Sequence, residues 1–254
     1  MVARNFLEVD NNILYPRLDV AGAKTGITGM EFPLLNYLTY LFSEMFGYQH
    51  WYGRLINLIV SSIGLWYFFI LVRKYFNPKT AFNATLILLF SIWFSYSRKI
   101  MPDTFSMSFI LASIYYGSNY LDNKSPKNSF YNLLLYIFLS TLGMLSKLPS
   151  AYLLALFILF IFNYRIKLTR KIYFSIASII SISIPSIWYF YWVPYLVETY
   201  NFWYFFMGNT FIEGARNLLK HFTETIENFS TTIAVPTMVA MVMFGPLNDI
   251  ITSI

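Results

Sequence analysis

Long uncharged segments alternate with short polar ones along this chain. Spanning a bilayer as a helix takes about 20 mostly apolar residues. Segments close to that length or longer lack Asp, Glu, Lys and Arg at 55–72, 80–97, 104–121, 128–146, 148–164, 172–197 and 228–248. All but the last are apolar on every face, which is typical of lipid-embedded helices and not of amphipathic surface helices. We therefore predict an all-α, polytopic integral membrane protein with about seven transmembrane helices, the last of them interrupted by prolines.

The first 50 residues follow a different pattern. We expect a short helix, then a turn-rich loop, then a second helix that begins after Pro33 and ends before Gly47, as is usual at helix ends. Nearby aromatic residues place this segment at the membrane interface. Four parts are predicted: 1–50, an extracytoplasmic loop with interfacial helices; 51–197, a six-helix transmembrane core; 198–230, an extracytoplasmic amphipathic segment; and 231–254, the last transmembrane segment.

Composition supports this class and excludes others. Hydrophobic residues make up 57% of the chain and charged residues 12%, against roughly 25% charged residues in an ordinary soluble domain. The same values exclude disorder, which needs low hydrophobicity and high charge. The net charge of +6 does not indicate nucleic acid, because the bases are scattered between apolar segments. The lack of Cys excludes disulfides and Cys-based metal or redox sites.

Basic residues in the short loops predict the orientation. The loops at 73–79, 122–127 and 163–171 carry nine Lys and Arg residues and one acid, Asp122. Cytoplasmic loops are enriched in Lys and Arg, so these loops are predicted to be cytoplasmic, and residues 1–50 and about 195–230 extracytoplasmic. The N-terminus then lies outside without a signal peptide. We therefore expect a preceding helix or an unusual topology.

The extracytoplasmic side carries the candidates for chemistry. A sugar on a polyisoprenyl phosphate is a natural substrate for a membrane enzyme. Cations would hold its phosphate and stabilise it as a leaving group, and a carboxylate would deprotonate an acceptor hydroxyl. The candidate acids are Asp19, Glu31 and Asp103, and the candidate phosphate ligands are Arg17, Arg54, Arg98, Lys99 and Lys147. Each also has a structural explanation, as a cation that reaches lipid headgroups or an acid at a helix start.

The order of these residues resembles a known family. The segments that carry the resemblance are Ala3–Leu7, Asn12–Asp19, Gly29–Leu34, Trp51–Leu55 and Arg98–Asp103, with Lys147 and Pro149. They resemble the outer loops of membrane glycosyltransferases with the GT-C fold, in particular the glycosyltransferase family 39 branch of protein mannosyltransferases and aminoarabinose-transferase-like enzymes. The resemblance covers residues 3–150 well and is weak beyond about 195.

The resemblance implies an enzyme of the cell membrane with an extracytoplasmic active face. It would transfer a sugar from a dolichyl or undecaprenyl phosphate carrier to a hydroxyl of a protein, lipid or glycan, with inversion at the anomeric centre. Carried over by motif, Asp19 and Glu31 would be acceptor-side acids and Asp103 a second-loop acid, with Arg17, Arg98 and Lys147 on the phosphate side. Some relatives bind a divalent metal near these acids, but no ligand set here demands one. Relatives often have further helices at both ends, so this chain alone is expected to show no turnover.

Two non-enzymatic interpretations stay open: a transporter or flippase component, and a structural interaction subunit. Transporters concentrate ionisable groups near the bilayer midplane, on broken helices. In this chain, segments 55–72, 80–97 and 104–121 contain no ionisable side chain except Tyr. The charged groups gather at one face instead, which favours chemistry at the interface.

The orientation can be tested by labelling single cysteines, because the chain has no native Cys. With the basic loops in the cytoplasm, an impermeant thiol reagent should label Ser97→Cys but not Asn163→Cys in intact cells. Labelling of Asn163→Cys alone would show that the orientation is reversed.

Overall fold

The computed structural model describes residues 1–19, 21–122, 126–158 and 166–201, together with 216, 219–222 and 224. Within these ranges the regular secondary structure is helical, and an isolated antiparallel bridge joins Arg17 and Ile27. This confirms the predicted all-α class.

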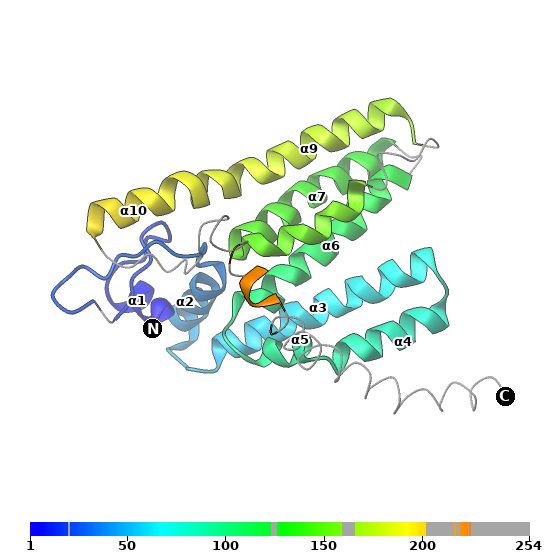
Figure 1. Ribbon diagram of the computed structural model, residues 1–254. Coiled ribbons are helices and arrows are strands. Elements are labelled where there is room, and N and C mark those ends of the chain that lie inside the picture. Colours follow the sequence, from blue (N-terminus) through cyan, green and yellow to red (C-terminus); the bar gives the residue numbers. More distant parts are fainter. Residues whose placement is uncertain are drawn as a thin grey trace.

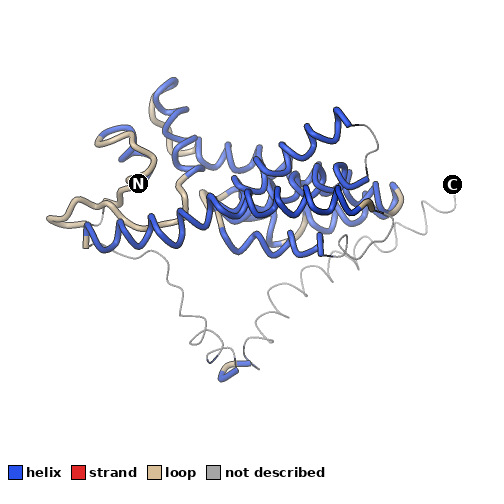
Figure 2. The backbone as a smooth tube through the Cα atoms, turned by 90° about the horizontal axis from the view of Figure 1, so that it is seen from above, coloured by secondary structure: helices blue, strands red, loops and turns tan. Residues whose placement is uncertain are grey.

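The helices form a packed row with a smaller N-terminal group at one end (Figure 1). The row contains α4 (Pro78–Leu89), α3 (Tyr52–Tyr75), α6 (Pro102–Asp122), α7 (Pro126–Ser146) and α9 (Leu168–Ile187), which contact one another in that order. Seen from above, the row and the N-terminal group remain distinct (Figure 2). Because α6 lies between α3 and α7, most of its side chains are buried.

Three helices among the described residues are long and apolar enough to cross a membrane: Tyr52–Tyr75, Ser129–Ser146 and Leu168–Tyr200. The last is continuous over 33 residues, because α9 passes through a π-helical turn, η3 (Trp188–Trp192), into α10 (Val193–Tyr200). These three correspond to predicted segments 55–72, 128–146 and 172–197. Segment 104–121 is helix α6, which is more polar than these three helices.

Two predicted spans are not single continuous α-helices in the structure. Segment 80–97 is a bent pair, in which α4 meets α5 (Ile92–Ser95) and η1 (Tyr96–Arg98) at 55°. The bend falls at Ser91, whose hydroxyl and amide both donate to the Leu88 carbonyl, at 2.6 and 3.2 Å. Serine hydroxyls compete with the helical ladder in this way. With this pair the described part has up to four spans.

Segment 148–164 begins as the 3₁₀-helix η2 (Leu148–Phe157), and residues 159–165 lie outside the described part. Pro149 at its start and the i→i+3 bond from the Ser150 amide to the Lys147 carbonyl favour the tighter turn. The seventh predicted span, 228–248, and most of the predicted segment 198–230 also lie outside the described residues.

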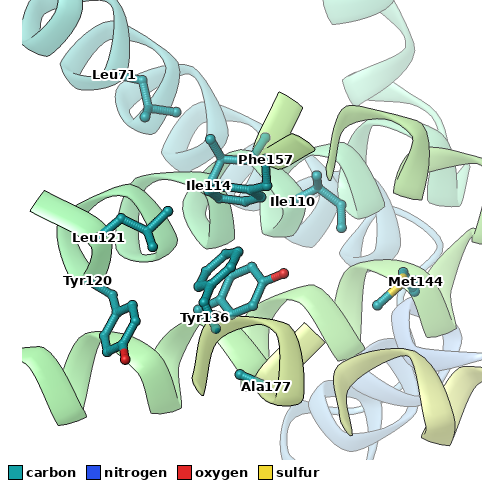
Figure 3. Close-up of a cluster of buried hydrophobic side chains, with 10 residues drawn as sticks. Leu71, Ile110, Ile114, Tyr120, Leu121, Tyr136, Met144, Phe157 and Ala177 are labelled. Carbon is teal, nitrogen blue, oxygen red and sulfur yellow. The ribbon is translucent and has the colours of Figure 1, made fainter. Parts of the chain in front are cut away.

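A cluster of buried hydrophobic side chains joins neighbouring helices of the row (Figure 3). Tyr136 of α7 stacks on Phe174 of α9 at 4.6 Å between ring centroids, and Phe157 of η2 packs edge-on against Tyr136 at 5.5 Å. Ile110 and Ile114 of α6 complete the contact. This packing fixes α6, α7 and α9 relative to one another.

The N-terminal group consists of α1 (Val2–Glu8), a long loop, and α2 (Leu34–Phe46). The loop packs on the end of η3 and on α10. The indole of Trp192 in η3 donates to the Leu14 carbonyl at 2.9 Å, and Lys24 donates to the carbonyl of Asn201, which follows α10. A Cβ added to Gly29 would lie 2.8 Å from side-chain carbons of Val193 and Val197, so only glycine permits this approach. The two helices agree with the sequence, while their place at a membrane interface stays a prediction.

Charged loops lie at two opposite ends of the row. At one end Lys74 pairs with Asp122 at 2.7 Å, and Arg170 donates to the Tyr120 carbonyl at 2.9 Å. These two contacts connect the three regions predicted to be cytoplasmic. The N-terminal group and the start of α6 lie at the other end (Figure 1). Ser97 is fully buried, so exposed Lys99 is a better position than Ser97 for the cysteine on that side.

Gly64 of α3 should be required for the contact between α3 and α6. A Cβ at this position would lie 2.6 Å from the Ser108 Cβ and 2.8 Å from its Cα, so the two backbones would have to separate. Gly64→Ala should cost about 1–3 kcal/mol, as overpacking does, and lower the midpoint of thermal unfolding in detergent. Ser62→Ala, two residues away and exposed, is the control. Equal midpoints for the two variants would contradict this packing.

Candidate functional site

Three charged side chains from distant parts of the sequence meet at the end of the row that holds the N-terminal group. The Lys147 Nζ lies 2.9 Å from a carboxylate oxygen of Glu31 and 3.4 Å from one of Asp103. We call this set the acid–lysine cluster. Glu31 precedes α2, Asp103 lies in the first turn of α6, and Lys147 follows α7. Their side chains are 22%, 47% and 28% exposed, so each can be reached by a ligand.

Asp103 is positioned by the start of α6 and by a buried amide from α3. Pro102 begins the helix, and an acid in the first turn is favoured by the helix dipole. The Asn57 side-chain amide donates to the carbonyls of Lys99 and Met101 at 2.8 and 3.1 Å. Asn57 is fully buried, so it holds the segment that leads into Asp103 against α3.

Lys147 is positioned by hydroxyl groups between α6 and the end of α7. The Ser106 hydroxyl donates to the Gly143 carbonyl at 2.7 Å and lies 2.6 Å from the Ser150 hydroxyl. Ser150 in turn donates to the Lys147 carbonyl at 2.8 Å. These bonds attach the backbone of Lys147 to the same helix that carries Asp103.

Glu31 is positioned through its two sequence neighbours. The Trp188 indole donates to the Met30 carbonyl at 3.1 Å. The Phe32 amide donates to the Leu145 carbonyl at 3.2 Å, and the ring of Phe32 packs edge-on against Trp188 with centroids 4.9 Å apart. The loop is therefore tied to both α7 and η3, on either side of Glu31.

The charges of the cluster favour a protonated Lys147. Burial alone would lower its pKa, but the hydrogen bond and charge of Glu31, with those of Asp103, outweigh burial and raise the pKa above its ordinary value of 10.5. Lys147 thus carries a positive charge throughout the physiological range. An ammonium in this setting is a ligand for an anionic group such as phosphate.

A cavity of about 190 Å³ borders the cluster. Glu31 and Ser146, the residue before Lys147, are part of its wall. The remaining lining is mostly apolar and comes from the N-terminal group and the segment before α6: Val2, Leu18, Met30, Phe32, Pro33, Leu35, Asn36, Ile100 and Pro102. The carboxylate of Glu31 therefore lies beside a space that a small apolar or partly polar group can enter.

The structure brings Glu31, Asp103 and Lys147 together, but it does not bring every candidate to this point. Asp19 pairs with Arg4 at 2.6 Å. Arg17 pairs with Asp10 at 3.2 Å and donates to the Thr25 carbonyl, which stabilises the loop. The remaining candidates, Arg54, Arg98 and Lys99, are exposed, and the Lys99 ammonium covers the ring of Tyr96 at 4.5 Å. The role of Asp19 as an acid, and the roles of these four cations as phosphate ligands, stay predictions.

Several residues that position the site are not ionisable, so the search of the sequence for ionisable groups missed them. Asn57, Ser106 and Trp188 bear no charge, yet each holds a backbone segment next to a cluster residue. One signal was present in the sequence: Asn57 is an amide within an otherwise apolar segment, where polar side chains usually have a specific partner.

A metal site does not emerge from the described residues, which contain no group of three or more His, Asp or Glu side chains that could hold an ion. Glu31 and Asp103 both form ion pairs with the Lys147 ammonium. The divalent metal raised by the resemblance stays a hypothesis, and no step below uses it.

The chain is similar to known glycosyltransferases. A family model described as dolichyl-phosphate-mannose-protein mannosyltransferase matches residues 31–190, a range that begins at Glu31 and includes the whole cluster. The fold is similar to the crystal structure of ArnT from Cupriavidus metallidurans in the apo state, with a TM-score of 0.59 and 15% sequence identity. This similarity covers 82% of the chain and 38% of ArnT, so most of that protein lies outside it. No curated protein matches the chain.

The charge on Lys147 should stabilise the folded protein at neutral pH and lose this effect only at high pH. Since its pKa is raised in the folded protein, the stability it contributes is complete below its ordinary pKa of about 10.5 and is lost as pH rises through the raised value. Wild type should therefore be more stable than Lys147→Met at neutral pH, and this gap should shrink above about pH 10.5. Thermal unfolding of both proteins over a pH series measures the gap, and the difference cancels the shared ionisation of tyrosines. A gap that stays constant into the alkaline range would contradict the raised pKa.

Proposed function

Because the chain belongs to the dolichyl-phosphate-mannose-protein mannosyltransferase family, within the GT-C membrane glycosyltransferases, we propose that it transfers a sugar from a polyprenyl-phosphate carrier to a hydroxyl group. The acceptor is a protein, lipid or glycan, and the reaction takes place at the extracytoplasmic face of the cell membrane. The observation that carries this proposal is the acid–lysine cluster beside the cavity.

Lys147 binds the phosphate of the donor in this proposal. In the absence of substrate its ammonium is shared between two carboxylates. A lipid phosphate that enters the site is a stronger partner, since charge-assisted bonds to phosphate are short and strong. As the bond between the anomeric carbon and the phosphate oxygen breaks, negative charge grows on the phosphate, and the fixed ammonium stabilises it.

Glu31 is the base that activates the acceptor. It lines the cavity and is the less exposed of the two acids in the cluster. The acceptor oxygen attacks the anomeric carbon while its proton moves to the Glu31 carboxylate, and the carrier phosphate leaves. Asp103 holds Lys147 from the other side and maintains the negative charge that keeps the lysine protonated. A single displacement of this kind inverts the anomeric centre.

The other candidates assist at the same face. Arg54, Arg98 and Lys99 are exposed cations, which attract the anionic donor to this end of the protein. The resemblance implies that Arg17 would act on the phosphate side and Asp19 on the acceptor side. Both keep these roles as hypotheses, because their present ion-pair partners are Asp10 and Arg4.

The proposal is tested in liposomes that contain a polyprenyl-phosphate sugar, with release of the sugar-free carrier phosphate as the readout. Because the chain alone is expected to show no turnover, the variants are made in a version that is extended at both ends. Glu31→Gln and Lys147→Met should each lower turnover by at least about a hundredfold, because a positioned base contributes that much or more. Asp103→Asn should lower it less, because Asp103 does not touch the reacting atoms in this scheme.

The second lysine–acid pair supplies matched controls. Lys74 and Asp122 form a 2.7 Å ion pair at the opposite end of the row, so Lys74→Met and Asp122→Asn change the same charges away from the site. Both should keep near wild-type turnover. Equal losses in the two pairs would contradict the assignment of the site, and carrier movement across the membrane without sugar release would favour a flippase.

A further inference from the structure

The 33-residue helix that α9, η3 and α10 form together changes its geometry where it passes the acid–lysine cluster. In η3 the Val193 amide donates to the Trp188 carbonyl, which is the five-residue spacing of a π-helix. Such a turn accommodates one extra residue and is frequent at functional sites. As a consequence, the buried face of α9, which includes Ser181 and Pro185, and the buried face of α10, which includes Val193, are offset by one residue.

The wider turn buries two consecutive residues, Trp188 and Tyr189, which are 5% and 6% exposed. Their neighbours Phe190 and Tyr191 are 74% and 66% exposed. Consecutive residues of a regular α-helix do not face the same direction. The π-helical turn thus turns two adjacent side chains toward the site and the next two away from it.

Each of the two buried residues holds a different side of the cluster. The Trp188 indole donates to the carbonyl of Met30, next to Glu31, at 3.1 Å. The Tyr189 hydroxyl donates to the carbonyl of Leu145, two residues before Lys147, at 2.7 Å. The same Leu145 carbonyl accepts the Phe32 amide, so the loop with Glu31 and the end of α7 share one anchor.

These contacts are independent of the charges themselves. Trp188, Tyr189, Leu145 and Val193 form one buried cluster, against which Phe32 packs. The spacing between Glu31 and Lys147 is therefore set by side chains that are shielded from solvent and are not themselves part of the cavity lining. The only polar atoms that these two side chains direct at the site are the indole N–H and the phenol O–H.

We infer that Trp188 and Tyr189 are a pair of positioning residues that set the geometry between the base and the phosphate-binding lysine. This inference rests on the proposed function for its meaning in catalysis, but the positioning itself is a property of the fold. Trp188 aligns the Glu31 loop, and Tyr189 aligns the end of α7 that carries Lys147.

The kinetic test uses variants that remove only the donor groups, Trp188→Phe and Tyr189→Phe, with Tyr191→Phe as the control from the exposed side of the same turn. Trp188→Phe should lower kcat by about 10- to 100-fold with little change in the donor KM, because misplacing a base by about 1 Å has effects of that size. Tyr189→Phe should raise the donor KM, because it displaces Lys147. Tyr191→Phe should match wild type.

A double variant separates positioning from general destabilisation. If Trp188 acts through Glu31, then Trp188→Phe should cause no further loss in a Glu31→Gln background, since coupled residues are not additive. Additive losses, or the same change in kcat and KM for both single variants, would overturn the inference in favour of a merely structural role.

A second measurement does not depend on turnover. In the combined Trp188→Phe and Tyr189→Phe variant, hydrogen exchange in the segment around Met30 and Phe32 should be at least about tenfold faster, because local opening becomes easier when anchors are lost. Tyr191→Phe should leave it unchanged. Unchanged exchange in the combined variant would overturn the inference whatever the activity. Faster exchange in a protein that moves the carrier across the membrane without releasing sugar would support the positioning pair and reject the proposed function.

Discussion

Polar groups buried between lipid-embedded helices must find their partners within the protein, because the bilayer core offers none. Helix α6 meets this requirement at many positions. Its buried Ser and Thr side chains bond either to their own helix, as Ser108 does to the Thr104 carbonyl, or to a neighbour, as Ser106 does to the Gly143 carbonyl. Asn57 of α3 adds bonds to the segment that precedes α6. In the part of the chain that the structure describes, the buried side-chain atoms without a partner are few: Arg17 Nε, Trp93 Nε1 and Ser97 Oγ.

These hydrogen bonds set the geometry of the candidate site. Asp103 stands at the start of α6, and the hydroxyl of Ser106, one turn further on, reaches the end of α7 just before Lys147. The acid and the lysine are thus placed by neutral groups in the bundle, and their ion pair at 3.4 Å forms on a framework that already exists. Partly exposed ion pairs contribute little stability by themselves, so this framework is the more important determinant of their position.

Glu31 reaches the same point by a different route. It belongs to the N-terminal group, which packs on the row through Gly29, Trp188 and Trp192. The close approach at Gly29 and the edge-on contact of Phe32 with Trp188 bring a loop from the first 35 residues against the outer helix near residue 190. Binding and catalytic residues are often carried by loops that a rigid scaffold holds in this way.

The sequence by itself determined the membrane class, the helical segments and the separation of charges, because these depend on the local density of apolar and basic residues. It also identified Glu31, Asp103 and Lys147 as candidates, since ionisable residues beside apolar segments are rare enough to be conspicuous. It could not show that Arg17 and Asp19 pair with Asp10 and Arg4, or that segment 80–97 bends at Ser91. Only the tertiary structure decided which charges meet and that Asn57, Trp188 and Tyr189 hold them, because these contacts join residues about 40 to 160 positions apart. Contacts over such distances follow from helix packing and from the one-residue offset of the π-helical turn, which no local pattern of residues encodes.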